Sequence, residues 1–272
     1  MNGLIPPFEW YRVVIEPWAV GASTSIWIVL MGALVAVSCG LIGCFLVLRG
    51  MSLIGDAISH AVLPGIALAF LLSGSRASLP MFVGAAIFGV LTAVLIEAVY
   101  KHSRIKQDAA MGVVFSTLFA VGVILISVLA DKVDLDQECV LYGEIAFIPL
   151  EDRATWLGVE LGPESVMIMA FVCGMIVLGI ALFYRPLLVA SFDPALATSM
   201  GFSAMLIHYA MMTMLSLTIV SAFESVGAIL VVSMLIAPAA TAYLLTDRLS
   251  RMLVISAAHG VLTSLGGWHL SV

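Results

Sequence analysis

The chain has very little charge. Only 10% of its 272 residues are Asp, Glu, Lys or Arg, and 62% are apolar, against about 25% and about 45–50% in an average soluble domain. No soluble core of this length encloses so many apolar side chains, so the composition excludes a soluble enzyme, a nucleic-acid binder and a disordered regulator. The formal net charge of −6 would also repel the phosphates of a nucleic acid. The sequence therefore indicates an integral membrane protein.

Several chemical motifs are absent as well. There is no G-x-x-x-x-G-K-[ST], the usual loop for ATP phosphates, so any ATP hydrolysis is expected in a partner subunit. There is no H-E-x-x-H and no G-x-S-x-G, which removes two common hydrolase machineries. The four cysteines form no C-x-x-C pair and predict neither a redox centre nor a zinc site. We therefore expect no enzyme activity and no permanently bound cofactor.

Long apolar runs are what the sequence does contain. A membrane-crossing helix needs roughly 20 mostly apolar residues, and eight runs approach this length. The second and the seventh contain Pro64 and Pro238, so we expect those helices to be bent or broken. The predicted fold class is all-α, a polytopic transmembrane bundle of about eight spans in a single domain, 1–272. The runs cover residues 25–48, 56–73, 79–99, 109–130, 166–184, 205–222, 226–245 and 252–270.

Lys and Arg are divided unevenly between the loops. Alternate loops on one side carry seven basic residues and those on the other side carry four, and the more basic side is cytoplasmic. The short segment 1–24 is then external, as is a loop at about 131–165 that holds nine acidic residues and two basic ones. That loop is either simply solvated, which we favour, or a surface for cations or a delivery protein.

Small residues recur every fourth position in the first and the fourth spans. This spacing lets helices approach closely, so it predicts a compact bundle, with further subunit contacts. The residues are Gly32, Ala36, Gly40 and Cys44 in the first span, and Gly112, Ser116 and Ala120 in the fourth.

Two ionisable residues lie where the second span begins. Asp56 and His60 are four positions apart, so on a helix they share a face, with Cβ atoms roughly 5–6 Å apart. A carboxylate and an imidazole placed in this way can bind one cation. Pro64 has no N–H and so leaves the carbonyl of His60 free to act as a third ligand. These donors suit divalent manganese, iron or zinc rather than copper(I). The alternative is a pair that caps the helix near the interface and binds nothing.

Other ionisable residues give weaker signals. Glu224 lies between the sixth and seventh spans and is a weak candidate for an external mouth, although a solvated turn is the interpretation we favour. No function is predicted for the remaining residues, which are expected to be solvated, packed or at the interface: Glu97, His102, His208, His259 and His269.

Five stretches resemble the permease subunits of bacterial ABC importers for manganese, zinc and iron, the ABC-3 permeases. The placement of glycine, aspartate and proline carries the resemblance, which covers almost the whole chain in the expected order. The stretches run from Arg49 to Gly65 (RGMSLIGDAISHAVLPG), Asp108 to Gly122, Asp136 to Ile145, Ser191 to Gly201 and Val226 to Ala242.

The resemblance implies a role for the cytoplasmic segment at about 186–204, which in the family docks on the ATP-binding subunit. Asp193 and Pro194 can begin a short helix there, with the aspartate as its cap and the proline in its first position. The residues expected to couple the chain to the ATPase are Ser191, Phe192, Asp193, Pro194, Ala197 and Gly201.

The resemblance also implies that Asp56 and His60 line the path of the metal. The expected partners are an ATP-binding subunit on the cytoplasmic side, an external metal-binding solute-binding protein, a second permease, identical or related, and membrane lipids. The expected location is the bacterial cytoplasmic membrane. The expected function is import of a divalent metal, with manganese favoured and zinc or iron open. Transport of a metal chelate and gradient-coupled secondary transport are the alternatives.

Overall fold

The structure is a computed structural model that describes residues 10–19, 21–51, 53–74, 78–129, 143, 145–156 and 159–271. The elements in chain order are η1 (Tyr11–Ile15), α1 (Glu16–Ala19), α2 (Ala22–Leu48), α3 (Ile54–Ser73), α4 (Ser78–His102), α5 (Gln107–Leu129), η2 (Ile145–Leu150), β1 (Arg153–Trp156), β2 (Val159–Pro163), α7 (Glu164–Leu182), α8 (Tyr184–Phe192), α9 (Pro194–Ser199), α10 (Ala204–Leu245) and α11 (Leu249–Ser271).

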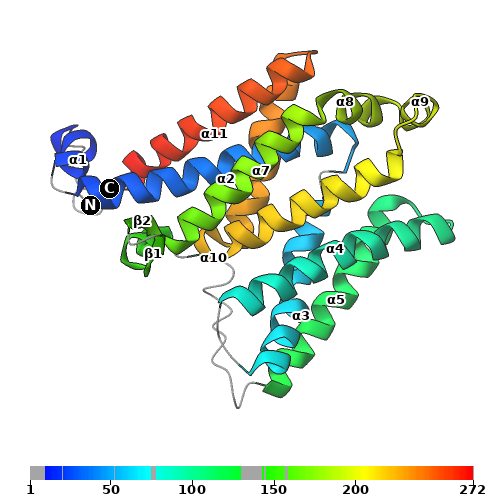
Figure 1. Ribbon diagram of the computed structural model, residues 1–272, viewed down its shortest axis with the longest axis horizontal. Helices are drawn as coiled ribbons and strands as arrows, with labels where there is room; N and C mark the ends of the chain where they lie inside the picture. Colours follow the sequence, from blue (N-terminus) through cyan, green and yellow to red (C-terminus); the bar gives the residue numbers. More distant parts are fainter. Residues whose placement is uncertain are drawn as a thin grey trace, which may run out of the picture.

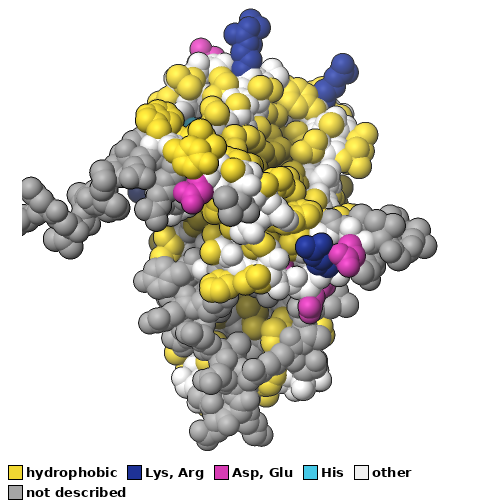
Figure 2. Space-filling model, turned by 90° about the vertical axis from the view of Figure 1, so that its left-hand side faces the viewer, with side chains coloured by type: hydrophobic (Ala, Val, Ile, Leu, Met, Phe, Trp, Pro, Cys, Tyr) yellow, Lys and Arg dark blue, Asp and Glu magenta, His cyan; other side chains and the backbone are white. Residues whose placement is uncertain are grey.

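Eight helices in the described part of the chain are long and apolar enough to cross a membrane. This confirms the predicted all-α bundle of about eight spans, and α10 contributes two of them, Ala204–Phe223 and Ser225–Leu245. Both chain termini lie at one end of the bundle with β1 and β2, whereas α8 and α9 lie at the other (Figure 1). Apolar side chains cover most of the coloured surface in Figure 2, as a lipid-facing surface requires.

The helices form two groups that α10 joins. One group packs α7, α10 and α11 around α2, and the other consists of α3, α4 and α5. The small residues of α2 make the first group compact: a Cβ on Gly43 would overlap the carbonyl oxygen of Leu235, and one on Gly260 would lie 2.9 Å from the Cβ of Ala36. Two of the predicted small residues pack in the same way, since a Cβ on Gly32 would lie 2.5 Å from Oγ of Ser264 and one on Gly40 2.6 Å from Oγ of Ser256.

The small residues of α5 behave differently. Gly112, Ser116 and Ala120 are exposed, and a Cβ built on Gly112 would meet no atom within 4 Å. This stripe makes no close helix contact within the described chain, so a subunit contact there stays a prediction.

Neither proline breaks its helix. α3 is helical from Ile54 to Ser73 through Pro64, whose ring fits against Gly122 of α5. The break within 204–245 lies at Gly227, with φ 75° and ψ 162°, and not at Pro238. A positive φ of this kind costs glycine little and other residues much more. The two spans of α10 therefore meet at a glycine that the sequence analysis did not single out.

A small β-hairpin occupies the end of the bundle where the termini lie. β1 and β2 pair antiparallel, with Arg153 opposite Pro163, and Arg153 donates a hydrogen bond to Glu160 over 3.1 Å. The hairpin belongs to the predicted acidic loop at 131–165, of which residues 131–142 lie outside the described residues. The sequence predicts this segment only as a loop.

The contact between Gly43 and Leu235 gives a stability prediction. We expect Gly43→Ala to lower the melting temperature of the purified protein by several degrees, because the new methyl must displace backbone, and such overpacking costs about 1–3 kcal/mol. Gly174→Ala on α7 is the matched control, since a Cβ there meets nothing within 4 Å. Equal melting temperatures for the two variants would contradict the assigned packing of α2 on α10.

Candidate functional site

Asp56 and His60 lie on the first two turns of α3 and face each other. Nε2 of His60 is 3.6 Å from Oδ1 of Asp56, and their side chains are 28% and 47% exposed. This distance is too long for a hydrogen bond. The carboxylate of Asp56 and the imidazole of His60 are therefore close together, and no hydrogen bond between them occupies their lone pairs.

The separation of these two atoms suits a shared cation. With metal–ligand distances of about 2.1 Å, as in zinc sites, atoms 3.6 Å apart subtend an angle of about 120° at the metal, close to the tetrahedral value. An octahedral ion such as manganese needs its neighbouring ligands about 3 Å apart, which a small side-chain rotation supplies. The described residues contain no cluster of three or more His, Cys, Asp or Glu that could hold a metal, so in this part of the chain the pair has no third side-chain ligand of these types.

Two aromatic rings of α5 hold the imidazole in place. The ring of His60 lies 5.3 Å from that of Phe115 and 5.5 Å from that of Phe119, measured between centroids. Phe115 and Phe119 are one helical turn apart, so they form a single apolar surface beside the imidazole. This contact restricts the imidazole to a few orientations and limits the access of water from that side.

Glu224 lies at the junction of the two spans of α10, three residues before Gly227. Only its backbone is among the described atoms. Its predicted place between the sixth and seventh spans is confirmed, while a role at the external mouth stays a prediction.

The segment predicted to couple to an ATPase contains a well-formed short helix, α9. Asp193 is extended, and its Oδ1 accepts hydrogen bonds from the backbone N–H groups of Ala195 and Leu196, both 2.9 Å long. Pro194 occupies the first turn, as predicted. At the other end Gly201 takes a φ of 88°, and the N–H of Phe202 donates to the carbonyl of Ala197 over 3.0 Å.

The residues of this segment divide into buried and exposed sets. Ser191 and Ala197 are buried, and the hydroxyl of Ser191 donates to the carbonyl of Leu187 over 2.7 Å. Phe192, Leu196 and Met200, four positions apart, are 62%, 50% and 56% exposed. Large apolar side chains at the end of the bundle therefore project away from it.

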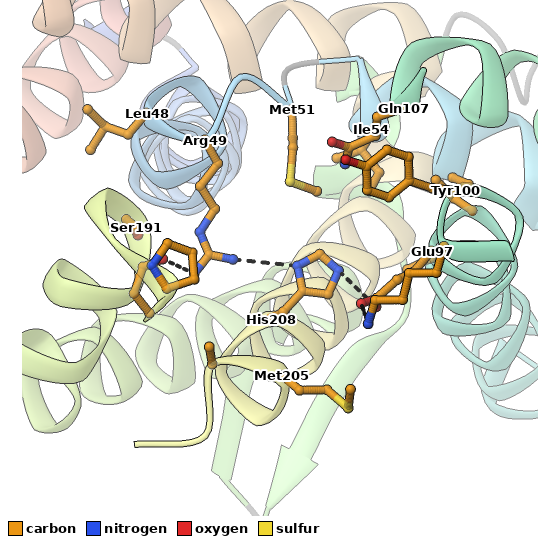
Figure 3. A pocket seen from close by; sticks show the side chains of 16 residues that line it. Leu48, Arg49, Met51, Ile54, Glu97, Tyr100, Gln107, Ser191, Met205 and His208 are labelled. Carbon is orange, nitrogen blue, oxygen red and sulfur yellow. Dashed lines mark hydrogen bonds and ion pairs between the residues drawn. The ribbon is translucent and has the colours of Figure 1, made fainter. Parts of the chain in front are cut away.

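A second polar cluster surrounds a cavity of about 470 Å³ beside α8 (Figure 3). Nη2 of Arg49 donates to the carbonyl of Ala190 over 3.3 Å, and Nη1 lies 3.5 Å from Nδ1 of His208. Nε2 of His208 lies 3.4 Å from Oε2 of Glu97, which also pairs with Lys101. We call Arg49, His208 and Glu97 the Arg49 chain.

The Arg49 chain has a defined hydrogen-bond polarity. A guanidinium only donates, so Nδ1 of His208 must accept from it, and the proton of the neutral imidazole then resides on Nε2, which points at the carboxylate of Glu97. Burial lowers the pKa of Arg49 below its usual value, yet a guanidinium stays charged at any physiological pH. This cluster could not be predicted from the sequence, because Arg49 and His208 are 159 positions apart and no local pattern joins them.

Comparison with known proteins decides the family. Residues 23–272 match the family described as the ABC 3 transport family. The chain belongs to this family. The prediction made from the five stretches is therefore confirmed, and this ABC-3 permease is a multi-pass protein of the bacterial cytoplasmic membrane.

Individual relatives of the ABC-3 permease are similar over most of its length. The manganese transport system membrane protein MntD of Bacillus subtilis is 51% identical over 242 residues, which are 89% of this chain and 81% of MntD. The zinc transport system membrane protein TroD of Treponema pallidum is 46% identical over 78% of this chain and 57% of TroD. The solved structure of PsaBC from Streptococcus pneumoniae in complex with Fab superposes with a TM-score of 0.75, at 38% identity, over 94% of this chain and 85% of that one.

The cap of α9 gives a local prediction. Replacing an N-cap aspartate by alanine costs about 0.5–2 kcal/mol of helix stability, so we expect Asp193→Ala to speed amide hydrogen exchange across residues 195–199. Asp193→Ser should keep most of the protection, because its hydroxyl can also accept from the helix N-terminus. Asp247→Ala, at an exposed acid between α10 and α11, is the control. Unchanged exchange in Asp193→Ala would show that the cap does not hold α9.

Proposed function

We propose that this ABC-3 permease is the membrane-spanning subunit of an ATP-driven importer of a divalent transition metal, with manganese favoured and zinc or iron open. The observation that carries the proposal is the Asp56–His60 pair, whose facing oxygen and nitrogen atoms are 3.6 Å apart. Carboxylate and imidazole are ligands for manganese, iron and zinc, whereas copper(I) selects thiolate and thioether. MntD and TroD, named for manganese and zinc transport, support the same range of substrates.

A two-residue site suits a transporter better than a storage site. Conduction needs binding that is favourable enough to admit the ion and weak enough to release it. The remaining ligands would come from water, from the carbonyl of His60, or from a second permease subunit facing the first. Two identical copies would bring two carboxylates and two imidazoles to one central path, a complete set for one divalent cation.

The energy source in this proposal is a separate ATP-binding subunit that docks on α9. Phe192, Leu196 and Met200 expose apolar surface at the end of the bundle that carries the most Lys and Arg, where water and not lipid surrounds the chain. Exposed apolar patches of this kind mark protein–protein contacts. At the opposite end, an external solute-binding protein would deliver the metal.

The metal pair gives the main functional prediction. In proteoliposomes that contain the permease with its ATP-binding subunit, we expect Asp56→Asn and His60→Ala each to reduce manganese uptake about tenfold or more, since loss of a metal ligand removes several kcal/mol of binding. Asp108→Asn and His102→Ala, which change an exposed acid and an exposed histidine beside the α4–α5 turn, should transport like the wild type.

The same assay separates the competing outcomes. Uptake that survives in both Asp56→Asn and His60→Ala would show that the pair is a helix cap and not a metal site. Uptake that continues without ATP or the partner subunit would indicate gradient-coupled transport. Offering manganese, zinc and iron in parallel identifies the preferred ion.

The docking surface gives a further prediction. We expect Leu196→Ser to weaken association with the ATP-binding subunit about tenfold or more, because truncating a central apolar anchor at an interface costs roughly 2 kcal/mol or more. Leu245→Ser is the matched control, since Leu245 is an even more exposed leucine at the end of α10. Pull-down or titration with the purified partner measures the difference, and equal affinities would place the docking surface elsewhere.

A further inference from the structure

The side chain of Arg49 connects elements that the chain otherwise keeps apart. Its guanidinium reaches the carbonyl of Ala190 on α8 with one nitrogen and His208 on α10 with the other. His208 in turn contacts Glu97 on α4. One charged side chain thus joins α2, α8, α10 and α4 at the end of the bundle beside α9, as Figure 3 shows.

Arg49 is connected to α9 on one side and to Asp56 on the other through short segments of the chain. Ala190 lies three residues before Asp193, the cap of α9. Arg49 caps α2 and lies seven residues before Asp56. The turn between α2 and α3 is held by a backbone hydrogen bond from Met51 to the carbonyl of Leu46 and by one from Ile54 to that of Met51, 2.9 and 3.2 Å long. A displacement of α8 would therefore pass through the guanidinium into the turn that leads to the metal pair.

The Arg49 chain also resembles a metal site, and its chemistry argues against that role. Glu97 and His208 offer a carboxylate and an imidazole, the same donors as Asp56 and His60. However, Nε2 of His208 carries the proton while Nδ1 accepts from Arg49, so neither nitrogen has a free lone pair. Lys101 and Arg49 add two positive charges beside the carboxylate, which would repel a divalent cation.

We propose that Arg49 is a positioning residue that transmits the movement of the α8–α9 segment to the Asp56–His60 pair, so that ATP hydrolysis and metal release stay coupled. The inference rests on the proposed function, because it assumes that α9 receives the movement of an ATP-binding subunit. The planar guanidinium suits this role, since its rigid fork holds two acceptors at a fixed distance from each other. A lysine ammonium at the same position would keep the charge and lose this geometry.

The test measures how much metal is moved per ATP hydrolysed by the intact complex in proteoliposomes. In Arg49→Gln we expect about a tenfold fall in manganese moved per ATP, a size typical of coupling between two sites. Binding of manganese by the assembled complex and its rate of ATP hydrolysis should both stay within about twofold of wild type, the difference that a coupling change much smaller than 1 kcal/mol would give. Arg251→Gln on α11, at an exposed arginine near the same end, should behave like the wild type in all three measurements.

Two substitutions of His208 test the same chain from its other side. His208→Phe removes both the acceptor for Arg49 and the imidazole nitrogen that faces Glu97, so it should lower the manganese moved per ATP as Arg49→Gln does. His208→Gln keeps an acceptor oxygen and an N–H donor and should restore most of the manganese moved per ATP. These two His208 variants also test the role of Arg49 if Arg49→Gln fails to assemble with its partner.

Three results would overturn the inference. They are a wild-type ratio of manganese to ATP in both Arg49→Gln and His208→Phe, equal ratios in His208→Phe and His208→Gln, or loss of manganese binding in Arg49→Gln, which would reveal a structural role. Asp56→Asn measured alongside keeps the two proposals separate. If Asp56→Asn abolishes uptake while Arg49→Gln couples normally, only the role of Arg49 fails; if uptake survives in Asp56→Asn, the proposed metal path itself fails.

Discussion

The polar side chains of this bundle are governed by one constraint, the cost of an ionisable group in a membrane-spanning helix. Such a group is stable there only beside a partner or an aqueous path. Asp56 faces His60, and Glu97 is shared by Lys101 and His208. These two partnerships differ in one respect: the atoms of the first stand 3.6 Å apart and leave room for a cation, whereas the carboxylate of the second already has the positive charge of Lys101 beside it.

The helix packing explains how the two partnerships can communicate. Glycines let α2 contact α10 and α11 closely, so these helices form one tightly packed group. α3 carries Asp56 and His60 in the second group, and the turn after Arg49 joins the two groups along the chain. The two groups also meet through α10, which packs on α3 and α4. Packed cores of this kind move as units and do not deform continuously.

Most of the fold follows from the sequence because apolar length and basic-residue bias are strong signals in a membrane protein. The eight spans and the cap of α9 at Asp193 could both be predicted, since each depends on neighbouring residues. A bend or break was expected at Pro238 within the seventh span, whereas the non-helical residue is Gly227. A proline is visible in the sequence, while the φ of a glycine is fixed by the packing around it.

The residues of the candidate site also differ in whether the sequence alone could predict their contacts. Asp56 and His60 are four residues apart and lie on one helical face whatever the tertiary structure. Phe115 and Phe119, which orient His60, and the contact of Arg49 with His208 come from residues far apart in the chain. Only the packing of α3 on α5 and of α2 on α10 brings them together.

The central claim is that His60 and Asp56 bind the metal as it passes. The most direct measurement is pulsed electron paramagnetic resonance of manganese(II) bound to the assembled complex whose ATPase is held inactive. Coordination by His60 predicts a nitrogen coupling in the manganese spectrum, and this coupling disappears in His60→Ala. A spectrum that shows only oxygen and water ligands, or a nitrogen coupling that persists in His60→Ala, would contradict the account.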